Sequence, residues 1–570
     1  DYKLGTDVYS VFRHGYDQIG ARGGANTTAN GVGGVVENRN NYRSLNSNGY
    51  LTATKRYKSW TGTAIVGTEF QQIYSDGATL NGKGIIIRDF EQLSNTTTFT
   101  PAPANGSSKS RLLGLYGDFA IGFKSIFNLN VTLRNDWSST FKIGKNSYLY
   151  NGISGSVNIT ELFPGIKSNF IENIKVRGNI ATVGKAGDFL YSTDSYYGGA
   201  GSADGFGPTI AFPFNGIQGF ALSNSAGNAD LGPEFTKNKE MAIEFSLFKG
   251  RLNFEGTRYV QKSRKLIFGV PVSATAGITT VVKNAGNLSN NGVEMGINGT
   301  PIKTKSFTWN INFTYTQFKA IVEKLETGVT NIFLGGFTTP NVRLVVGDEY
   351  GQIYGNAYQR DATKGNKIIV GANGLPLITP GVQKIGNPNP KWVGGLTNTF
   401  SYKGLSMTVF LEYRKGGQIY SRNIADLQRN GVVKETAEFP RFDANGIETK
   451  EYLFDAVYAN GQPNTTKVSA FDYWGNNGVF VAAEGFIFET TWFRVREASI
   501  DYVVPSSVLR KLPFGSASFS VFGRNLFLHA PNYPHLDPEQ NALGVSNAQG
   551  LEFNALPQTR TIGVGLKLSF

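Results

Sequence analysis

Several residue types are scarce in this sequence, and each scarcity excludes a class of protein. The 570 residues include no Cys, 3 Met and 3 His. The lack of Cys excludes disulfide frameworks, thiol nucleophiles and thiolate metal sites. No run of 18 or more apolar residues occurs, and the longest candidate, Gly478 to Phe488, is broken by Glu484. A helical membrane protein is therefore excluded. If this chain spans a membrane, it does so as a β-barrel.

Charged residues are also few, at 17% of the chain, although the formal net charge is +13. A positive balance of this size can indicate nucleic-acid binding. Here, however, Lys and Arg are scattered singly, without a dense basic block or a basic helix, so no nucleic-acid partner is expected. The abundant residues are 70 Gly, 41 Phe and 26 Tyr. Many aromatic residues with few Met and few charges are typical of a large β structure.

The last nine residues, Ile562 to Phe570, predict the closing strand of an outer-membrane β-barrel. Apolar side chains occupy every second position, so they share one face of a strand. In a water-soluble sheet, that face would pack on a core and the strand would usually run on into a polar tail. In a transmembrane barrel, a strand of about ten residues spans the hydrocarbon layer, and an aromatic side chain lies in the interfacial girdle. The apolar positions are Ile562, Val564, Leu566, Leu568 and Phe570.

The rest of the chain predicts long strands joined alternately by short and long links. This asymmetry is typical of a barrel with periplasmic turns at one end and extracellular loops at the other. The expected loops are residues 15 to 44, Ser75 to Ser107 and Lys185 to Lys237. Strands are predicted at 9–14, 45–56, 61–73, 108–123, 127–138, 147–160, 170–184, 238–249, 250–263, 290–302, 305–319, 391–403, 404–415, 491–504, 515–528 and 562–570, with short strands near 340–346 and 349–360.

Within these strands, apolar and polar residues alternate. The apolar face is expected to contact lipid and the polar face a wet lumen, although a soluble sandwich alternates too. The total is about 17 or 18 strands. Barrels of one bacterial chain close with an even number, so this count favours an incomplete barrel. The clearest apolar faces are Phe307, Trp309, Ile311, Phe313 and Tyr315; Leu405, Met407, Val409, Leu411 and Tyr413; and Phe127, Leu129, Val131 and Leu133.

Short motifs occur in a fixed order along nearly the whole chain. They are Leu133 to Ser139 (LRNDWSS), Gly227 to Glu234 (GNADLGPE) with Glu240, Asn284 to Asn287 (NAGN) with Asn291 to Glu294 (NGVE), Asn387 to Trp392 (NPNPKW), Tyr402 to Leu405 (YKGL), Phe493 to Arg496 (FRVR) continuing through Tyr502 to Pro505, Gly523 to Phe527 (GRNLF) and Asp537 to Glu539 (DPE). No single motif is diagnostic. As a set, they resemble the C-terminal barrel of the SusC/RagA family of TonB-dependent transporters from Bacteroidota.

This resemblance implies a fold, a location and partners. Members of the family have a barrel of about 22 strands, an N-terminal plug inside it, a TonB-box segment before the plug, and a SusD-like surface lipoprotein that closes over the extracellular face. Residues 1–570 resemble all but the first few strands, and no plug-like or TonB-box-like sequence is present. The chain is therefore expected to begin inside a longer polypeptide. The implied location is the bacterial outer membrane, among its lipids.

The implied function is uptake of an oligosaccharide or a peptide, driven by TonB through a plug outside this sequence, with no cofactor. Two alternatives remain open. One is a SusC-like barrel that acts as a structural scaffold in a multi-protein outer-membrane complex. The other is a passive porin or adhesin barrel complete in this chain. An enzyme is not expected, because no nucleophile, base and orienting group occur together.

Candidate site residues are weighed against structural roles. A metal site from His14, His529 and His535 is disfavoured, because these residues are far apart or lie in one loop beside prolines. Asp537 and Glu539 resemble a carboxylate pair for acid/base catalysis, but a loop-structuring role is preferred. Asp230 to Glu234 reads as a turn that returns a long loop to the next strand. The Gly-rich run Gly20 to Gly34 lacks the strand-to-helix context of a phosphate loop.

A ligand site is expected on the long loops and the lumen wall. Aromatic side chains in polar loops stack on sugar rings or grip peptide side chains, although they equally pin loops to each other or to a partner protein. No metal ligands, catalytic residues or cofactor-binding residues are predicted. The possible ligand or partner residues are Tyr196, Tyr197, Phe206, Phe212, Phe214, Tyr473 and Trp474.

Overall fold

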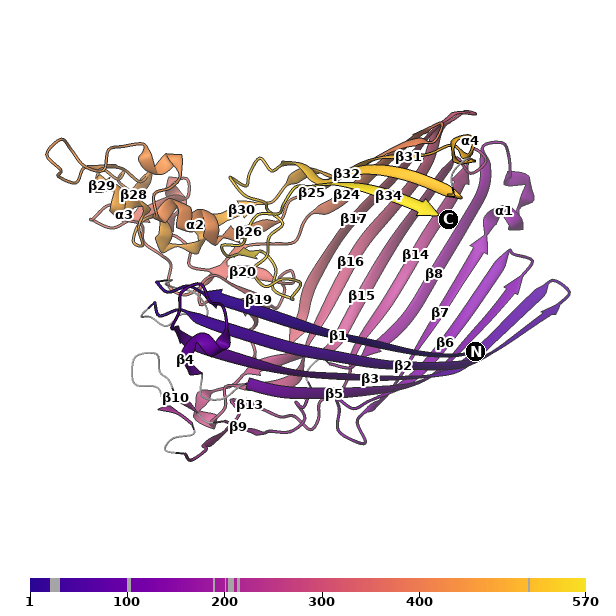
Figure 1. The fold of residues 1–570 in the computed structure, drawn as a ribbon, viewed down its shortest axis with the longest axis horizontal. Coiled ribbons are helices and arrows are strands. Elements are labelled where there is room, and N and C mark those ends of the chain that lie inside the picture. Colours follow the sequence, from indigo (N-terminus) through magenta and orange to yellow (C-terminus); the bar gives the residue numbers. More distant parts are fainter. Residues whose placement is uncertain are drawn as a thin grey trace. The chain divides into compact units, whose positions relative to one another are not determined.

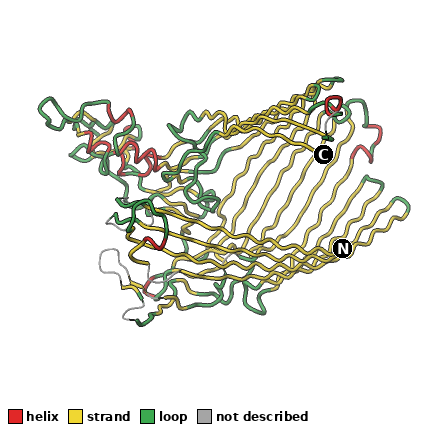
Figure 2. The backbone as a smooth tube through the Cα atoms, in the orientation of Figure 1, coloured by secondary structure: helices red, strands yellow, loops and turns green. Residues whose placement is uncertain are grey.

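The regular structure is mostly β-strand, and the described α-helices are short and lie in the connections between strands (Figure 2). The computed structural model describes residues 1–20, 31–99, 104–187, 190–199, 201–202, 210–212, 216–510 and 513–569. None of the helices in these ranges is long and apolar enough to cross a bilayer. The chain divides into two compact units: Asp1–Ser156, Asn179–Asn238 and Ser263–Asn287 in unit 1, and Val157–Gly178, Lys239–Lys262 and Leu288–Phe570 in unit 2.

Unit 1 contains a run of antiparallel hairpins whose register is unbroken over long distances. In the β2–β3 hairpin, every residue from Gly34 to Tyr57 pairs with one from Lys83 back to Trp60. β1 pairs along the other edge of β2, and β5 pairs with both β3 and β6. Figure 1 shows β1, β2, β3 and β5 side by side in indigo and purple. The strands are β1 (Tyr2–Asp17), β2 (Gly34–Tyr57), β3 (Trp60–Ile85), β4 (Thr96–Phe99), β5 (Ala104–Phe123) and β6 (Phe127–Ser138).

Unit 2 contains a second run of antiparallel strands, joined β17–β24–β25–β31–β32–β34. Its closing strand pairs with β32 from Thr561 to Ser569, as the sequence predicts for the C-terminal strand. The strands are β17 (Phe307–Leu325), β24 (Trp392–Tyr402), β25 (Leu405–Lys415), β31 (Trp492–Val503), β32 (Ser516–His529) and β34 (Thr561–Ser569).

Further long strands contribute residues to both units, and within the described ranges eighteen strands belong to one large sheet. They are β7 (Ser147–Asn158), β8 (Ile171–Lys185), β14 (Glu234–Leu247), β15 (Leu252–Pro271) and β16 (Thr280–Lys303), with the short β13 (Ser225–Ala226) parallel to β16.

The long connections hold small sheets and helices of their own. Four strands of unit 2 form a separate sheet in the order β18–β19–β20–β23. The small strands are β9 (Tyr197–Gly199), β10 (Gly201–Ser202), β11 (Ile210–Ala211), β12 (Phe220–Leu222), β18 (Asn331–Gly336), β19 (Asn341–Val345), β20 (Gln352–Gly355), β21 (Arg360–Asp361), β22 (Lys367–Val370), β23 (Gln383–Gly386), β26 (Gln418–Ser421), β27 (Lys450–Tyr452), β28 (Ala456–Tyr458), β29 (Val468–Ser469), β30 (Ile487–Glu489) and β33 (Leu551–Glu552). The α-helices are α1 (Ile159–Leu162), α2 (Arg422–Arg429), α3 (Ala470–Trp474) and α4 (Ser506–Leu509).

Many apolar side chains of the long strands are exposed rather than packed in a core. Leu129 in β6 is 44% exposed and Val66 in β3 is 50% exposed, for example. Burial of such side chains would stabilise a water-soluble sheet by about 1.5–3 kcal/mol each, so an exposed apolar face indicates contact with lipid. Buried apolar clusters lie in the connections, such as the one around Val342, Ile353 and Leu551, and at one place where Tyr148, Ile267 and Val282 of the long strands meet.

The structure corrects the predicted loops of the first hundred residues. Residues 34 to 44 belong to β2, and β3 extends to Ile85 within the segment that was expected to be a loop from Ser75. These extensions are mostly polar and carry few apolar residues, among them Val35, Val36 and Leu80, so an apolar–polar alternation does not reveal them. Hydrogen bonds between side chains hold them instead, such as Asn38 to Thr79 and Asn41 to Asp76.

The predicted number of about 17 or 18 strands agrees with the eighteen-stranded sheet, but two of the predicted strands are not part of that sheet. The short strands expected near 340–346 and 349–360 exist as β19 and β20, but they belong to the separate four-stranded sheet. β4 and β13 take their places in the eighteen-stranded sheet.

Candidate functional site

A polar wall lies on the β2–β8 strands of unit 1, around Arg134. The Arg134 guanidinium lies 2.7 Å from a carboxylate oxygen of Glu69 and donates to Asp136 at 2.8 Å. The hydroxyl of Tyr150 donates to the other oxygen of Asp136 at 2.5 Å. A Cβ on Gly114 would lie 2.6 Å from the Arg134 guanidinium, so only glycine leaves room for this arrangement.

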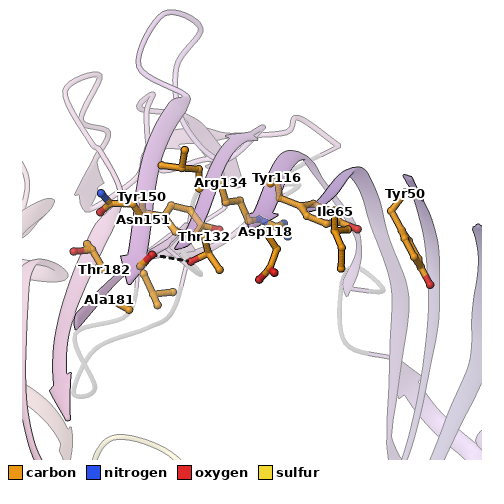
Figure 3. Close-up of a pocket in the computed structure, with 14 residues that line it drawn as sticks. Tyr50, Ile65, Tyr116, Asp118, Thr132, Arg134, Tyr150, Asn151, Ala181 and Thr182 are labelled. Carbon is orange, nitrogen blue, oxygen red and sulfur yellow. Dashed lines mark hydrogen bonds between the residues drawn. The ribbon is translucent and has the colours of Figure 1, made fainter. Parts of the chain in front are cut away.

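Of these residues, Arg134 and Tyr150 line a hollow of about 530 Å³ (Figure 3). Tyr116 donates from its hydroxyl to Asn48 at 3.0 Å, and the Arg134 guanidinium lies over its ring. The hollow is therefore lined by hydroxyl and amide groups, by the paired Arg134 and by the Asp118 carboxylate, together with the apolar residues Ile65, Leu133 and Val183. Other residues that line the hollow are Tyr50, Thr132, Asn151, Ala181 and Thr182.

Two motifs that are distant in sequence form one clip in unit 1. The Asn284 side chain accepts from the Gly232 N–H at 2.9 Å and donates to the carbonyls of Gly232 and Lys265 at 2.8 and 2.7 Å. Glu234 accepts from the N–H of Ile267 at 2.7 Å. The clip fixes the point where the long loop re-enters the sheet at β14, so the predicted role of Asp230 to Glu234 as a returning turn is confirmed.

The NPNPKW motif has a similar role in unit 2. Asn387 donates to Glu349 at 3.0 Å, and Asn389 donates to the carbonyl of Tyr350 at 2.9 Å. The Arg414 guanidinium donates to the carbonyl of Pro388 at 2.7 Å. The motif therefore ties the small β18–β19–β20–β23 sheet to the start of β24.

Asp348 holds this small sheet through its charge, which makes the sheet sensitive to acid. Burial alone would raise the pKa of Asp348, but hydrogen bonds from Lys384 and Tyr354, both at 2.7 Å, outweigh it and lower the pKa below its usual value. A carboxylate with a lowered pKa stabilises the fold above the pKa of its unfolded state, and this contribution is lost as the pH falls through the lower, folded value.

We therefore expect the 340–390 segment to become more susceptible to protease below about pH 4. Asp348→Asn should be more susceptible already at neutral pH and should lack part of the acid-dependent increase. The measurement is limited proteolysis of both proteins across that pH range with an acid-tolerant protease. Identical pH profiles for the two proteins would contradict this role of Asp348.

Two further motifs meet in a buried ion-pair network of unit 2. Arg494 is 1% exposed, and its guanidinium lies 2.7 Å from Asp537 and 3.0 Å from Glu539. Arg496 lies beside it and binds Glu539 at 2.8 Å and Glu412 at 2.5 Å. The pairing of β31 skips Arg496 on both sides, so this residue occupies a β-bulge. Asp537 and Glu539 thus anchor their loop to β31, as the preferred loop-structuring role requires.

The predicted ligand residues fall into two groups. Tyr196 and Tyr197 are 58% and 72% exposed in unit 1, and Phe212 is half-buried beside Gly219. Phe206 and Phe214 lie outside the described residues, as do most of the Gly20 to Gly34 run and the terminal Phe570.

Tyr473 and Trp474 lie in α3 and pack within a loop cluster of unit 2. The Tyr473 ring stacks on Phe454 with centroids 4.2 Å apart, and Trp474 meets Tyr452 edge-on at 6.0 Å. Burial raises the pKa of Tyr473. These two residues therefore contribute to the packing of the loop.

Trp474 also lines a groove that the sequence alone did not reveal. It has a volume of about 440 Å³ and lies among the end of α2, the 441–448 hairpin and α3. The Trp474 indole N–H is buried without an acceptor among the described residues. Arg441 packs directly on Gly431, where a Cβ would lie 1.9 Å from the guanidinium. The other lining residues are Gln428, Arg429, Asn430, Phe442, Glu448, Ala470, Phe471, Gly475 and Asn476.

His14 lies in β1 of unit 1, and His529 ends β32 of unit 2. His14 lies 3.8 Å from Glu37 and 3.9 Å from Glu91, near the end of β1. Within the part of the chain that the structure describes, no group of three or more His, Asp or Glu side chains is placed to hold a metal ion.

Comparisons with known proteins agree with this architecture. A family profile described as "TonB dependent receptor-like, beta-barrel" matches residues 1–462. TonB-dependent receptor P3 of Formosa agariphila is 25% identical over 577 residues, which cover 95% of this chain and 54% of that protein. TonB-dependent receptor SusC of Bacteroides thetaiotaomicron is 22% identical over 378 residues, covering 63% of this chain and 34% of SusC. This chain thus spans about half of the length of TonB-dependent receptor P3.

Among solved structures, the RagAB peptide transporter superposes with a TM-score of 0.73 at 19% identity, covering all of this chain and 60% of the matched chain. The likeness confirms the predicted all-β barrel fold. The family consists of transport proteins rather than enzymes, in agreement with the expected absence of catalysis. The chain belongs to the TonB-dependent receptor-like β-barrel family, and it is a SusC/RagA-like barrel of the bacterial outer membrane.

Proposed function

We propose that this chain forms the wall and the extracellular loops of an importer that takes up an oligosaccharide or a peptide across the outer membrane. The observation that carries the proposal is the two-faced character of the long strands. One face exposes apolar side chains such as Val66 and Leu129, and the other carries the hydrogen-bonded wall around Arg134. A wall of this kind contacts a polar solute while the opposite face contacts lipid.

The proposed mechanism has two steps. A SusD-like surface lipoprotein captures the solute against the extracellular loops, and TonB then acts on a plug to open the lumen. Both partners and the plug are proposals from the family resemblance, and residues 1–570 are proposed as the C-terminal part of the barrel. The likeness to RagAB supports a capture step, because structures of that peptide importer have been solved in an "open-open" and a "closed-closed" state.

The experiment is an uptake assay in the native host with the full-length protein. Cells with and without the gene are given a mixture of oligosaccharides and peptides, and depletion of each is followed by mass spectrometry. We expect one class to be depleted only when the gene is present, and only without a protonophore. Depletion that continues under the protonophore would indicate a passive porin.

The scaffold alternative gives a different result. Depletion would then be equal with and without the gene, while other outer-membrane proteins would decrease in abundance when the gene is removed. That outcome would overturn the importer proposal.

We further propose that the groove beside α3 takes part in substrate capture. Phe471 lines the groove and is 80% exposed, so its ring is available to a ligand. Stacking on an aromatic ring contributes about 1 kcal/mol beyond surface burial. Phe471→Ala should therefore weaken binding of the imported solute roughly fivefold, measured by calorimetry on the purified complex.

The matched control for Phe471→Ala is Val545→Ala, a fully exposed side chain in another loop. It should leave affinity unchanged, and neither substitution should change the thermal stability. Equal affinities for Phe471→Ala and the unsubstituted protein would remove the groove from the capture site.

A further inference from the structure

Three short hairpin turns share an arrangement that turn geometry does not explain. In each, an aromatic residue ends one strand and a lysine follows in the left-handed backbone region: Tyr57-Lys58, Phe123-Lys124 and Tyr402-Lys403, with lysine φ values of 51°, 46° and 44°. The left-handed conformation costs an L-residue with a Cβ about 1–2 kcal/mol, and turns usually place Gly or Asn there. Lysine therefore occupies these positions at a cost to stability.

Each lysine lies close to the aromatic residue before it. The Nζ atoms of Lys58, Lys124 and Lys403 lie 5.4, 5.5 and 5.2 Å from the ring centroids of Tyr57, Phe123 and Tyr402. Each ammonium group thus lies over the ring of the aromatic residue that precedes it.

The first two turns are neighbours in unit 1. The Lys124 N–H donates to the carbonyl of Ser59 at 2.9 Å, and the rings of Trp60 and Phe123 are 4.6 Å apart. Tyr57 and Trp60 remain 64% and 48% exposed. The two turns therefore form one surface, with two cations above a group of exposed aromatic rings.

These cations lack the anionic partners that other lysines have. Within the described ranges, neither Lys58 nor Lys124 has a carboxylate within 4 Å, whereas four lysines in the long connections do. These pairs are Lys145 with Asp230, Lys367 with Asp455, Lys384 with Asp348, and Lys467 with Glu451. An anion from outside the chain would complete the charge balance at the turns.

The strands that lead away from the turns continue the surface with an apolar face. Exposed side chains on β2, β3, β5 and β6 provide area for hydrocarbon chains. A ligand that fits both parts has an anionic head and long apolar tails. The exposed apolar residues are Leu51, Val66, Phe119, Ile121 and Leu129.

We propose that the β2–β3 and β5–β6 turns form a binding site for an anionic phospholipid, whose phosphate lies between Lys58 and Lys124 and whose acyl chains follow the exposed strand faces. Short turns lie at the periplasmic end of such barrels, where the leaflet consists of phospholipids. The exposed aromatic rings hold the turns at the headgroup level, and the ammonium groups select for negative charge. This site is independent of whether the protein transports a solute.

The test compares lipid binding by the full-length protein and two double variants. Native mass spectrometry with added phosphatidylglycerol or phosphatidylcholine measures the affinity for each lipid. Lys58→Asn/Lys124→Asn should lower the affinity for phosphatidylglycerol by roughly 30-fold, since a lysine near an anionic membrane surface contributes about 1 kcal/mol. Affinity for phosphatidylcholine should not change. Lys58→Arg/Lys124→Arg, which keeps both charges, should retain the preference for phosphatidylglycerol.

The asparagine variant separates binding from folding, because Asn adopts left-handed backbone more readily than Lys. Its thermal stability in phosphatidylcholine should be equal or higher, so a loss of phosphatidylglycerol binding would not reflect unfolding. An unchanged preference for phosphatidylglycerol in this variant would overturn the proposal. So would competition by inorganic phosphate at equal affinity, since the acyl chains would then contribute nothing. Lys434→Gln/Lys450→Gln, at exposed loop positions, is the matched control and should behave as the unsubstituted protein.

Discussion

Arg494→Met is expected to lower the free energy of unfolding by about 3–5 kcal/mol, the usual cost of removing one partner from a buried ion pair. Arg494 is 1% exposed and contacts Asp537 and Glu539. Without the Arg494 guanidinium, the Asp537 carboxylate remains buried, and among the described residues the N–H of Glu539 is its one remaining donor. Glu539 is less affected because it keeps Arg496.

The measurement for Arg494→Met is urea-induced unfolding in lipid vesicles, followed by tryptophan fluorescence, together with proteinase K cleavage between β32 and β34. The matched control is Arg524→Met on the neighbouring strand. Arg524 pairs with Glu497 at 3.1 Å, but these side chains are 61% and 44% exposed. An exposed pair contributes about 0–1 kcal/mol, so this change should have little effect. Equal effects of the two substitutions would contradict the role assigned to burial.

A double variant tests the origin of the effect. Arg494→Met/Asp537→Asn removes the orphaned negative charge together with its partner. It should be more stable than Arg494→Met alone, since desolvation of an unpaired charge is the main part of the cost. If the double variant were less stable than Arg494→Met alone, the cost of Arg494→Met would come from lost packing around Arg494 rather than from the unpaired charge.

Asn284→Leu is expected to lower the free energy of unfolding by about 2–4 kcal/mol. The side chain keeps nearly the same size but loses three hydrogen bonds, to the Gly232 N–H and to the carbonyls of Gly232 and Lys265. Each lost bond costs about 1 kcal/mol, and more where the partner group stays buried. The 185–237 connection should also become cleavable by protease, because the clip fixes its return to β14.

The control for Asn284→Leu is Asn253→Leu, which removes one hydrogen bond, to the carbonyl of Gly250 at an exposed turn. It should lower stability by about 0.5 kcal/mol or less. If Asn284→Leu left the 185–237 connection as protected as before, the clip would not be what orders it.

Local pattern predicts the membrane-spanning part of the strands well. The strand predicted at 127–138 is β6, with the same bounds. β25 begins one residue after the start of the predicted strand 404–415, and β34 begins one residue before the predicted strand 562–570. Side chains on a strand alternate between two environments, which in these segments are lipid and a polar lumen. Apolar and polar residues therefore alternate along the sequence, and this pattern can be recognised without the structure. Where most residues are polar, as at residues 34 to 44, the same criterion fails.

The candidate sites were less predictable, because their parts come from distant segments. Each motif was recognisable, but nothing in the sequence indicates that Asn284 meets Gly232 or that Arg494 meets Asp537. The groove beside α3 had a single predicted member, Trp474. Its other aromatic and charged residues are common in polar loops and follow no spacing rule.

The sequence by itself determined that this chain is an all-β membrane barrel of the SusC/RagA-like kind, since alternation, the lack of long apolar runs and the ordered motifs are local properties. Only the tertiary structure decided which motifs contact each other, that Arg494 is buried, and that Lys58 and Lys124 lie on neighbouring turns without carboxylate partners in the described residues. The physical reason is that burial and ion pairing depend on contacts between residues tens of positions apart, and strand register sets those contacts.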